Sequence, residues 1–129
     1  MIDPSAVEDD DVVLRHIPGG TLWQAPGLRI TSANFQIRPD RGETGVSVSR
    51  LSMTLPEHLF ARVGGNKANG SRIAAASVRA IRALGLEVVP DPLPNDPGHA
   101  EIRSATARLE ERDTRVRLAN LFQFLPTTP

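Results

Sequence analysis

Cysteine is absent from this chain of 129 residues, which contains only one tryptophan and four phenylalanines. The absence of cysteine excludes disulfide bonds, thiolate nucleophiles and cysteine-ligated zinc sites. No apolar run approaches the roughly 20 residues that are needed to span a bilayer. The amino terminus also lacks the basic and apolar regions of a signal peptide. We therefore expect a cytoplasmic protein without a membrane segment.

The formal net charge is zero, because Lys+Arg and Asp+Glu each number 15. This balance gives no general electrostatic case for binding nucleic acid. Lys67 is the only lysine, so arginine supplies almost all of the positive charge. The length is that of one domain with a single modest core. We place this domain at residues 11–126, after a flexible acidic tail at residues 1–10.

Two stretches, residues 28–37 and 46–53, have the composition of strands and are joined by turn-forming residues at 38–45. The apolar alternation changes parity at Ser32 in the first stretch and at Ser49 in the second. Side chains alternate between the two faces of a strand, so a change of parity requires a bulge or the end of the strand. We expect a pair of strands with such a break at each serine.

Three further strands are predicted at residues 12–17, 86–89 and 99–103. Residues 104–112 fit either a continuation of the last strand or the start of a helix, since alanine, arginine and glutamate are also good helix formers. The segment before the last strand holds four prolines, which favour an extended crossing.

Three helices are predicted. One follows the capping pair Thr54 and Glu57, one extends from Ser71 to Leu84 and stops at Gly85, and one extends from Asp113 to Leu125. Five strands and three helices without strict alternation indicate the α+β class. We expect one small domain, with a mixed, mostly antiparallel sheet of about five strands and about three helices packed on it.

The helix predicted from Ser71 to Leu84 carries arginine on its outer face, at Arg72, Arg79 and Arg82. Three arginines on one helix are usually a solvated surface. They also form a candidate binding face for an acidic partner, including the acidic amino terminus of the chain itself.

Four short motifs occur in order along the chain: Leu14-Arg15-His16-Ile17-Pro18, Thr31-Ser32-Ala33-Asn34-Phe35, Val46-Ser47-Val48 and His99-Ala100-Glu101-Ile102. In order and rough spacing they resemble a group of small uncharacterised bacterial proteins with the motifs Arg-x-Ile-Pro, Ser-Ser-Ala-x-Phe, Ser-Val and His-Ala-x-Ile. Thr31 stands where that pattern has its first serine. The resemblance implies a bacterial domain and picks out Arg15, Ser32, Ser47 and His99, but it implies no reaction.

The first functional hypothesis is a non-catalytic interaction or regulatory protein that works with a protein partner, such as another product of its operon, or as a homodimer. The small size and the absence of a complete catalytic motif favour it. Under this hypothesis Arg15, Ser32 and His99 are structural and satisfy backbone groups of bulges and loops. No cofactor and no metal is expected.

The alternative hypothesis is a small enzyme that acts on a nucleotide, similar to the bacterial toxins related to ADP-ribosyltransferases. Arg15 or His16, then Ser32, then Glu101 echo the order of polar residues in those enzymes. In such a site arginine binds a diphosphate, the hydroxyl positions a sugar, and the carboxylate stabilises positive charge that develops on the sugar. Any mixed sheet offers an arginine, a serine and a glutamate on strands, so this signal is weak.

Two other sites receive less support. A Ser-His-acid hydrolase would use Ser32 or Ser49 with His99, but no Gly-x-Ser-x-Gly motif is present. A metal site would use the three histidines His16, His58 and His99, but His58 has no second ligand at helical spacing.

Overall fold

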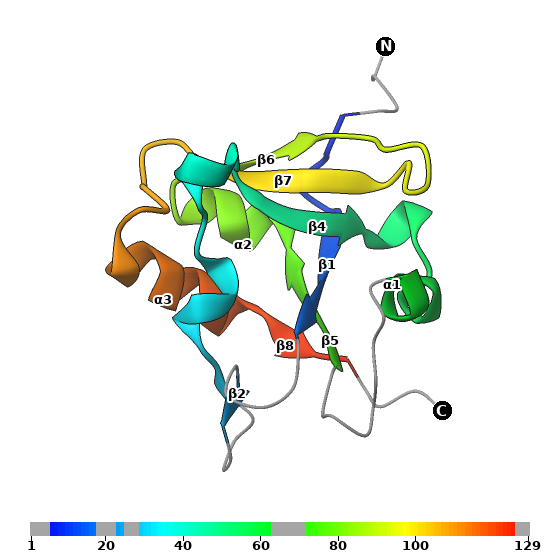
Figure 1. Cartoon of the computed structure of the whole chain (residues 1–129), viewed down its shortest axis with the longest axis horizontal. Coiled ribbons are helices and arrows are strands. Elements are labelled where there is room, and N and C mark those ends of the chain that lie inside the picture. The colour runs from blue at the N-terminus through cyan, green and yellow to red at the C-terminus, as the bar shows by residue number, and fades with distance from the viewer. Residues whose placement is uncertain (1–5, 18–22, 25–28, 63–71, 126–129) are drawn as a thin grey trace.

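A six-stranded antiparallel sheet forms the centre of the structure, a computed structural model that describes residues 6–17, 23–24, 29–62 and 72–125 (Figure 1). The strand order is β6-β7-β4-β1-β5-β8. The six strands are β1 (Val12–Ile17), β4 (Val46–Arg50), β5 (Arg72–Ser77), β6 (Leu86–Pro90), β7 (His99–Ser104) and β8 (Gln123–Phe124). A separate two-stranded sheet pairs β2 (Trp23–Gln24) with β3 (Arg29–Ile30).

The helices connect these strands and cover parts of the sheet. The α-helices are α1 (Pro56–Arg62), α2 (Val78–Ala83) and α3 (Arg112–Leu121). Three 3-10 helices are described as well: η2 (Ser32–Phe35), η3 (Pro39–Arg41) and η4 (Leu51–Met53). The prediction of one small α+β domain is confirmed, with six strands in the main sheet and every pairing antiparallel.

Three predicted strands are confirmed, since β1, β6 and β7 begin where the sequence pattern places them. Most of residues 104–112 form neither of the two predicted alternatives, a longer strand or the start of a helix. Strand β7 ends at Ser104, and a loop follows until α3 begins at Arg112. Within that loop Leu109 is fully buried, and its backbone N–H donates to the Ser104 hydroxyl. The buried Leu109 and this hydrogen bond help to hold the loop against the domain.

The helix predicted from Ser71 to Leu84 is wrong over its first half. Residues from Arg72 to Ser77 form β5, which pairs with β1 at six positions. Only Val78–Ala83 is helical, and the cap is Ser77, whose hydroxyl accepts a hydrogen bond from the N–H of Ala80. Helix propensity is a weak preference, and pairing with a buried strand outweighs it here. The predicted stop at Gly85 is confirmed by its φ of 95°.

The two strands predicted at residues 28–53 do not pair with each other. Strand β3 ends at Ile30 and pairs with β2, whereas β4 pairs with β1 and β7. The parity changes are strand ends, because η2 begins at Ser32 and η4 follows directly after Arg50. The apolar side chains beyond the second break, Leu51 and Met53, are exposed rather than in the core.

The carboxyl-terminal helix is shorter than predicted. Helix α3 ends at Leu121, and Gln123–Phe124 forms the edge strand β8 beside β5. The ring of Phe122 packs on Phe35 of η2, with 5.0 Å between the ring centroids. This contact fixes η2 against α3 on one side of the sheet.

Residues 6–10 lie within the predicted flexible tail, yet this segment and the adjoining Asp11 are held against the domain. Val7 is 6% exposed and belongs to the main core. Its carbonyl accepts a hydrogen bond from Arg82, and the carboxylate of Asp11 forms an ion pair with the buried Arg50 at 3.0 Å. Residues 1–5 lie outside the described part of the chain.

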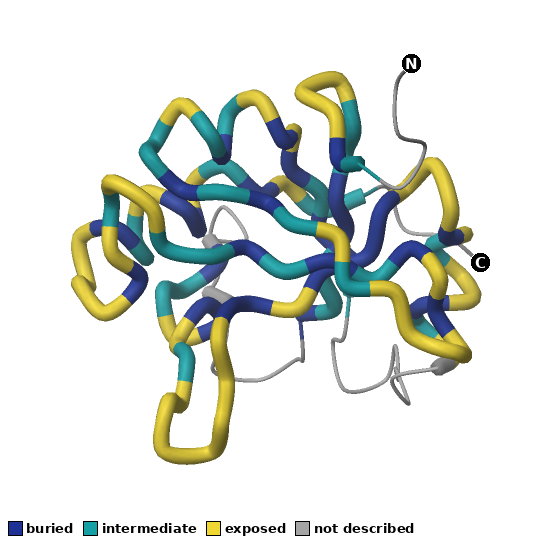
Figure 2. The backbone as a smooth tube through the Cα atoms, turned by 90° about the horizontal axis from the view of Figure 1, so that it is seen from above, coloured by how far each residue is buried: buried dark blue, intermediate teal, exposed yellow. Residues whose placement is uncertain are grey.

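The two faces of the sheet have different surroundings, and Figure 2 shows that buried residues concentrate along the strands. One face, which we name the covered face, packs against α2, α3 and η2. Its strand residues in the main core include Val13, Ile17, Val46, Val48, Ala74, Ala76, Ala100 and Ile102. The other face, named the open face, has a small apolar cluster of Leu14, Leu59 and Ile73 beside α1.

Candidate functional site

The central strands β1 and β4 stay together over only two paired positions, Val13 with Arg50 and Leu14 with Ser49. Beyond these pairs, the side chain of Arg15 bridges β1, β4 and η2. Its Nη1 donates to the carbonyl of Ser47 at 2.6 Å. Its Nε and Nη2 both donate to the carbonyl of Asn34, at 3.0 and 2.6 Å. The guanidinium thus supplies hydrogen bonds between β1 and β4 where their backbone pairing has ended.

The positive charge of Arg15 has no ion-pair partner among the described residues. The guanidinium lies 5.6 Å from the centroid of the Phe35 ring, which belongs to the covered face. Burial lowers the pKa of Arg15 to about 10, against an opposing influence of the Glu43 carboxylate. A desolvated cation that is held only by carbonyl oxygens and a ring face is an attractive position for an anion.

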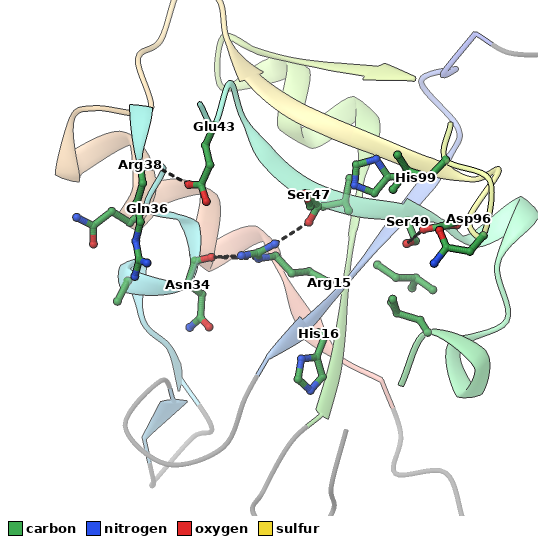
Figure 3. A pocket seen from close by; sticks show the side chains of 16 residues that line it. Arg15, His16, Asn34, Gln36, Arg38, Glu43, Ser47, Ser49, Asp96 and His99 are labelled. Atoms are coloured by element: carbon green, nitrogen blue, oxygen red, sulfur yellow. Dashed lines mark hydrogen bonds between the residues drawn. The ribbon is translucent and has the colours of Figure 1, made fainter. Parts of the chain in front are cut away.

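A pocket of about 570 Å³ opens beside this guanidinium, and Figure 3 shows the side chains that surround it. It lies between η2 and the Arg38–Glu43 segment on one side, and α1 with the β6–β7 loop on the other. The polar residues that line it are Arg15, His16, Asn34, Gln36, Arg38, Glu43, Ser47, Ser49, Asn95, Asp96 and His99. The apolar residues that line it are Leu14, Ala33, Val48, Leu59 and Leu93.

His16 lies beside Arg15 on β1 and presents the edge of its ring to Phe60 of α1, with 6.1 Å between centroids. Its Nε2 atom is buried and has no hydrogen-bond partner among the described residues. Burial, and to a smaller extent the charge of Arg15, lowers the pKa of His16 below its ordinary value. The ring is therefore neutral at pH 7 and keeps one unsatisfied nitrogen.

His99 is fixed at the other end of the pocket by the β6–β7 loop. Its Nδ1 atom lies 2.9 Å from the carbonyl oxygen and 3.2 Å from the carboxylate of Asp91. On β4, the neighbouring Ser49 hydroxyl donates to the buried carboxylate of Asp96 at 2.9 Å. Thr54 donates to the same carboxylate at 3.5 Å. These bonds attach the proline-rich loop to the sheet.

Three of the four residues that the resemblance picks out line this one pocket: Arg15, Ser47 and His99. Ser32 does not line it, although the next two residues of its motif do. Glu101 does not line it either; its carboxylate accepts from Thr44 at 2.8 Å and pairs with Arg103 at 2.9 Å. The set Arg15, Ser32 and Glu101, on which the enzyme hypothesis depends, is therefore not gathered in the pocket.

The other predicted sites are not assembled as sites. Among the described residues, no group of three histidine or acidic side chains is arranged to hold a metal ion. His58 lines a different groove from His16 and His99. The hydroxyl of Ser49 donates to Asp96 rather than to a histidine. The pocket thus contains histidines and serines without the geometry of a hydrolase triad.

The predicted arginine face does not exist as one surface, because Arg72 lies on β5 and only Arg79 and Arg82 lie on α2. Arg72 donates to the carbonyl of Leu125 and stacks on Phe124. Arg82 forms ion pairs with Asp9 and Glu87. One of the two acidic partners of Arg82 thus comes from the amino-terminal segment of the chain itself.

Sequence reasoning missed a surface formed by large apolar side chains. Leu51, Met53, Leu55 and Leu93 are between 41% and 53% exposed. The first three line a groove of about 460 Å³ together with residues of the β6–β7 loop, which also carries Leu93. We name these four residues the apolar rim. Apolar residues after a strand end were the available signal, but Leu51 and Met53 were interpreted as part of the strand.

Sequence reasoning also missed Asn34, Gln36, Arg38 and Asp96 as neighbours of the pocket. Asn34 occupies a position that varies in the motif pattern, and its backbone carbonyl, rather than its side chain, binds Arg15. Asp96 lies in the proline-rich segment that was interpreted as a crossing. No pattern of side chains in the sequence marks a contact that a backbone carbonyl makes.

No helix in the described part of the chain is long and apolar enough to cross a membrane. Comparison of the chain with protein-family models, curated proteins and solved structures gives no match. The functional argument therefore rests on the pocket and the apolar rim.

Proposed function

We propose that this protein is a non-catalytic interaction protein that works with a protein partner. The observation that carries this proposal is the apolar rim, formed by Leu51, Met53, Leu55 and Leu93 at the end of the sheet where β4 leads into α1. Clustered exposed apolar side chains beside a groove are typical of surfaces that bind other proteins.

The polar residues of the sheet give independent support. Arg15 directs its hydrogen bonds to the carbonyls of Asn34 and Ser47, and His99 contacts the carbonyl of Asp91. Side chains that hold backbone groups in this way perform a structural task. They do not form a set in which a nucleophile, a base and an orienting group contact one another.

The test is co-purification of the tagged full chain after expression with the products of neighbouring genes. We expect a stoichiometric complex with one of them. Leu55→Glu should weaken the complex at least about tenfold, because it places a charge in the apolar contact. Ala105→Glu is the matched control, since it adds the same charge at an exposed position of the loop before α3.

Both variants should keep the melting temperature of the parent chain, because both positions are exposed. If the chain forms a homodimer that Leu55→Glu dissociates, the partner is a second copy of the chain. A clean monomer that co-purifies with no neighbouring gene product would overturn the proposal. So would a complex that Leu55→Glu and Ala105→Glu weaken equally.

A further inference from the structure

The guanidinium of Arg15 has unused hydrogen-bonding capacity. An arginine carries five N–H groups. Three of them bind the carbonyls of Asn34 and Ser47. One N–H on Nη1 and one on Nη2 therefore make no hydrogen bond to a described residue. Two N–H groups on adjacent nitrogens of one guanidinium match the two oxygens of a carboxylate or phosphate.

The absence of an ion pair within the described part of the chain distinguishes Arg15 from Arg50 and Arg82. Arg50 and Arg82 both form ion pairs with carboxylates of the amino-terminal segment. Arg15 forms no ion pair with a described residue, although burial desolvates its guanidinium. A buried cation without an anion is costly, and an anion that enters the pocket would remove this cost.

The charges that face the pocket set the position of such an anion. Glu43 lies at its edge, where its carboxylate accepts from the backbone N–H of Arg38 at 2.6 Å. Asp96 lies at the opposite end, and the hydroxyls of Ser49 and Thr54 donate to its carboxylate. Both carboxylates would repel an anion. The favourable place is therefore the floor near Arg15, between these two ends (Figure 3).

The size and lining of the pocket indicate more than a bare inorganic ion. Its volume of about 570 Å³ lies in the range of pockets that enclose small organic molecules. Leu59 of α1 and Leu93 of the β6–β7 loop supply apolar contacts on the side away from η2. The exposed hydroxyl of Ser47 offers a further polar contact.

We propose that this pocket binds a small organic anion. Arg15 holds its carboxylate or phosphate group, and Leu59 and Leu93 contact its apolar part. The pocket shares Leu93 with the apolar rim, but the other three residues of the rim do not line it. The proposal does not depend on the protein partner proposed above.

The test compares four probes on the full chain: hexanoate, hexyl phosphate, the neutral hexanamide and inorganic phosphate. Binding is followed by calorimetry and by the NMR signals of the Arg15 side chain and the Ser47 amide. We expect hexanoate or hexyl phosphate to bind at least about tenfold more tightly than hexanamide, since hydrogen bonds to an ionised group are stronger than those to a neutral one. The preferred head group then distinguishes a carboxylate ligand from a phosphate ligand.

Replacing Arg15 leaves two carbonyls unpaired and can unfold the chain, so the decisive variant changes a different residue. Glu43→Gln removes a repelling charge from the edge of the pocket and keeps Arg15 in place. It should tighten binding of the anionic probes about threefold, as expected for one partly exposed charge, without affecting hexanamide. Glu57→Gln is the matched control, because Glu57 is exposed on α1 and does not line the pocket.

Three results would overturn the proposal. The first is that none of the probes binds at millimolar concentration or shifts the Arg15 signal. The second is equal affinity for hexanoate, hexyl phosphate and hexanamide, or an equal response of Glu43→Gln and Glu57→Gln. The third is that inorganic phosphate binds as tightly as hexyl phosphate, which would indicate an adventitious ion only.

Discussion

The two faces of the central sheet differ in what their side chains contact. On the covered face, Val46 and Val48 of β4 pack into a continuous core with α2, α3 and η2. On the open face of the same strand, Ser47 is exposed and Ser49 bonds to a loop carboxylate. The alternation of side chains along β4 thus places apolar residues in the core on one face and polar residues on the other.

The largest expected effect tests the covered face. Ile102→Ala removes a fully buried side chain from β7 and should lower the free energy of unfolding by about 3 kcal/mol, through lost burial and a cavity. Ser47→Ala, on the open face of β4, should change the free energy of unfolding by no more than about 0.5 kcal/mol. Urea unfolding of both variants measures the difference. Similar losses would show that the two faces contribute alike.

The next effect concerns the amino-terminal segment, which borders the covered face. Asp11→Ala removes one ion-pair partner of the buried Arg50 and should lower the free energy of unfolding by about 2 kcal/mol. Asp9→Ala breaks the more exposed pair with Arg82 and should cost about 0.5 kcal/mol or less. Thermal and urea unfolding check this order. Equal effects would mean that burial does not increase the contribution of the Asp11–Arg50 pair to the free energy of unfolding.

A smaller effect is expected at the end of α2. Gly85 has a φ of 95°, and a Cβ atom there would lie 2.4 Å from the hydroxyl oxygen of Thr106. Gly85→Ala should therefore lower the free energy of unfolding by about 1–2 kcal/mol. Gly42→Ala is a useful control, because its φ is also positive but a Cβ atom there meets nothing within 4 Å. An equal cost at both glycines would leave no role for the contact with Thr106.

The smallest effect is a pH dependence from the open face. The pKa of His16 is lowered from 6.5 in the folded protein, so the unfolded chain binds more protons just below that pH. The stability that depends on neutral His16 is complete above about pH 6.5 and falls as the pH drops toward the folded pKa. Urea unfolding at pH 7.5 and 5.5 should show a loss in the parent that is smaller in His16→Gln.

His58→Gln provides the comparison for that measurement, since His58 is exposed on α1. It should keep the pH dependence of the parent. If His58→Gln reduces the dependence as much as His16→Gln does, burial of His16 is not its cause.

Local patterns predicted much of the fold, and their failures have physical reasons. The strand at residues 12–17 and the stop at Gly85 follow from local residue patterns, and both were predicted correctly. The segment Arg72–Ser77 was predicted as helix because apolar residues recur there at three- and four-residue spacing, whereas its strand conformation depends on β1, far away in the sequence. The break at Ser32 was recognised as a strand end or bulge, but the pairing of its strand with β2 was not.

The candidate site was predictable only in part. Arg15, Ser47 and His99 were singled out by short motifs, and all three line the pocket. The role of Arg15 depends on carbonyls that are 19 and 32 residues away, which carry no side-chain signature. The apolar rim was missed, because Leu51 and Met53 have the composition of core residues and only the structure shows their exposure.

The narrow pairing between β1 and β4 divides the sheet into two halves, β6-β7-β4 and β1-β5-β8. Amide hydrogens along this boundary should exchange sooner than those between β1 and β5, which share six paired positions. The pocket takes residues from both halves, with Arg15 from one and Ser47 from the other. A molecule bound there contacts both halves, so its binding free energy increases the free energy that is needed to separate them.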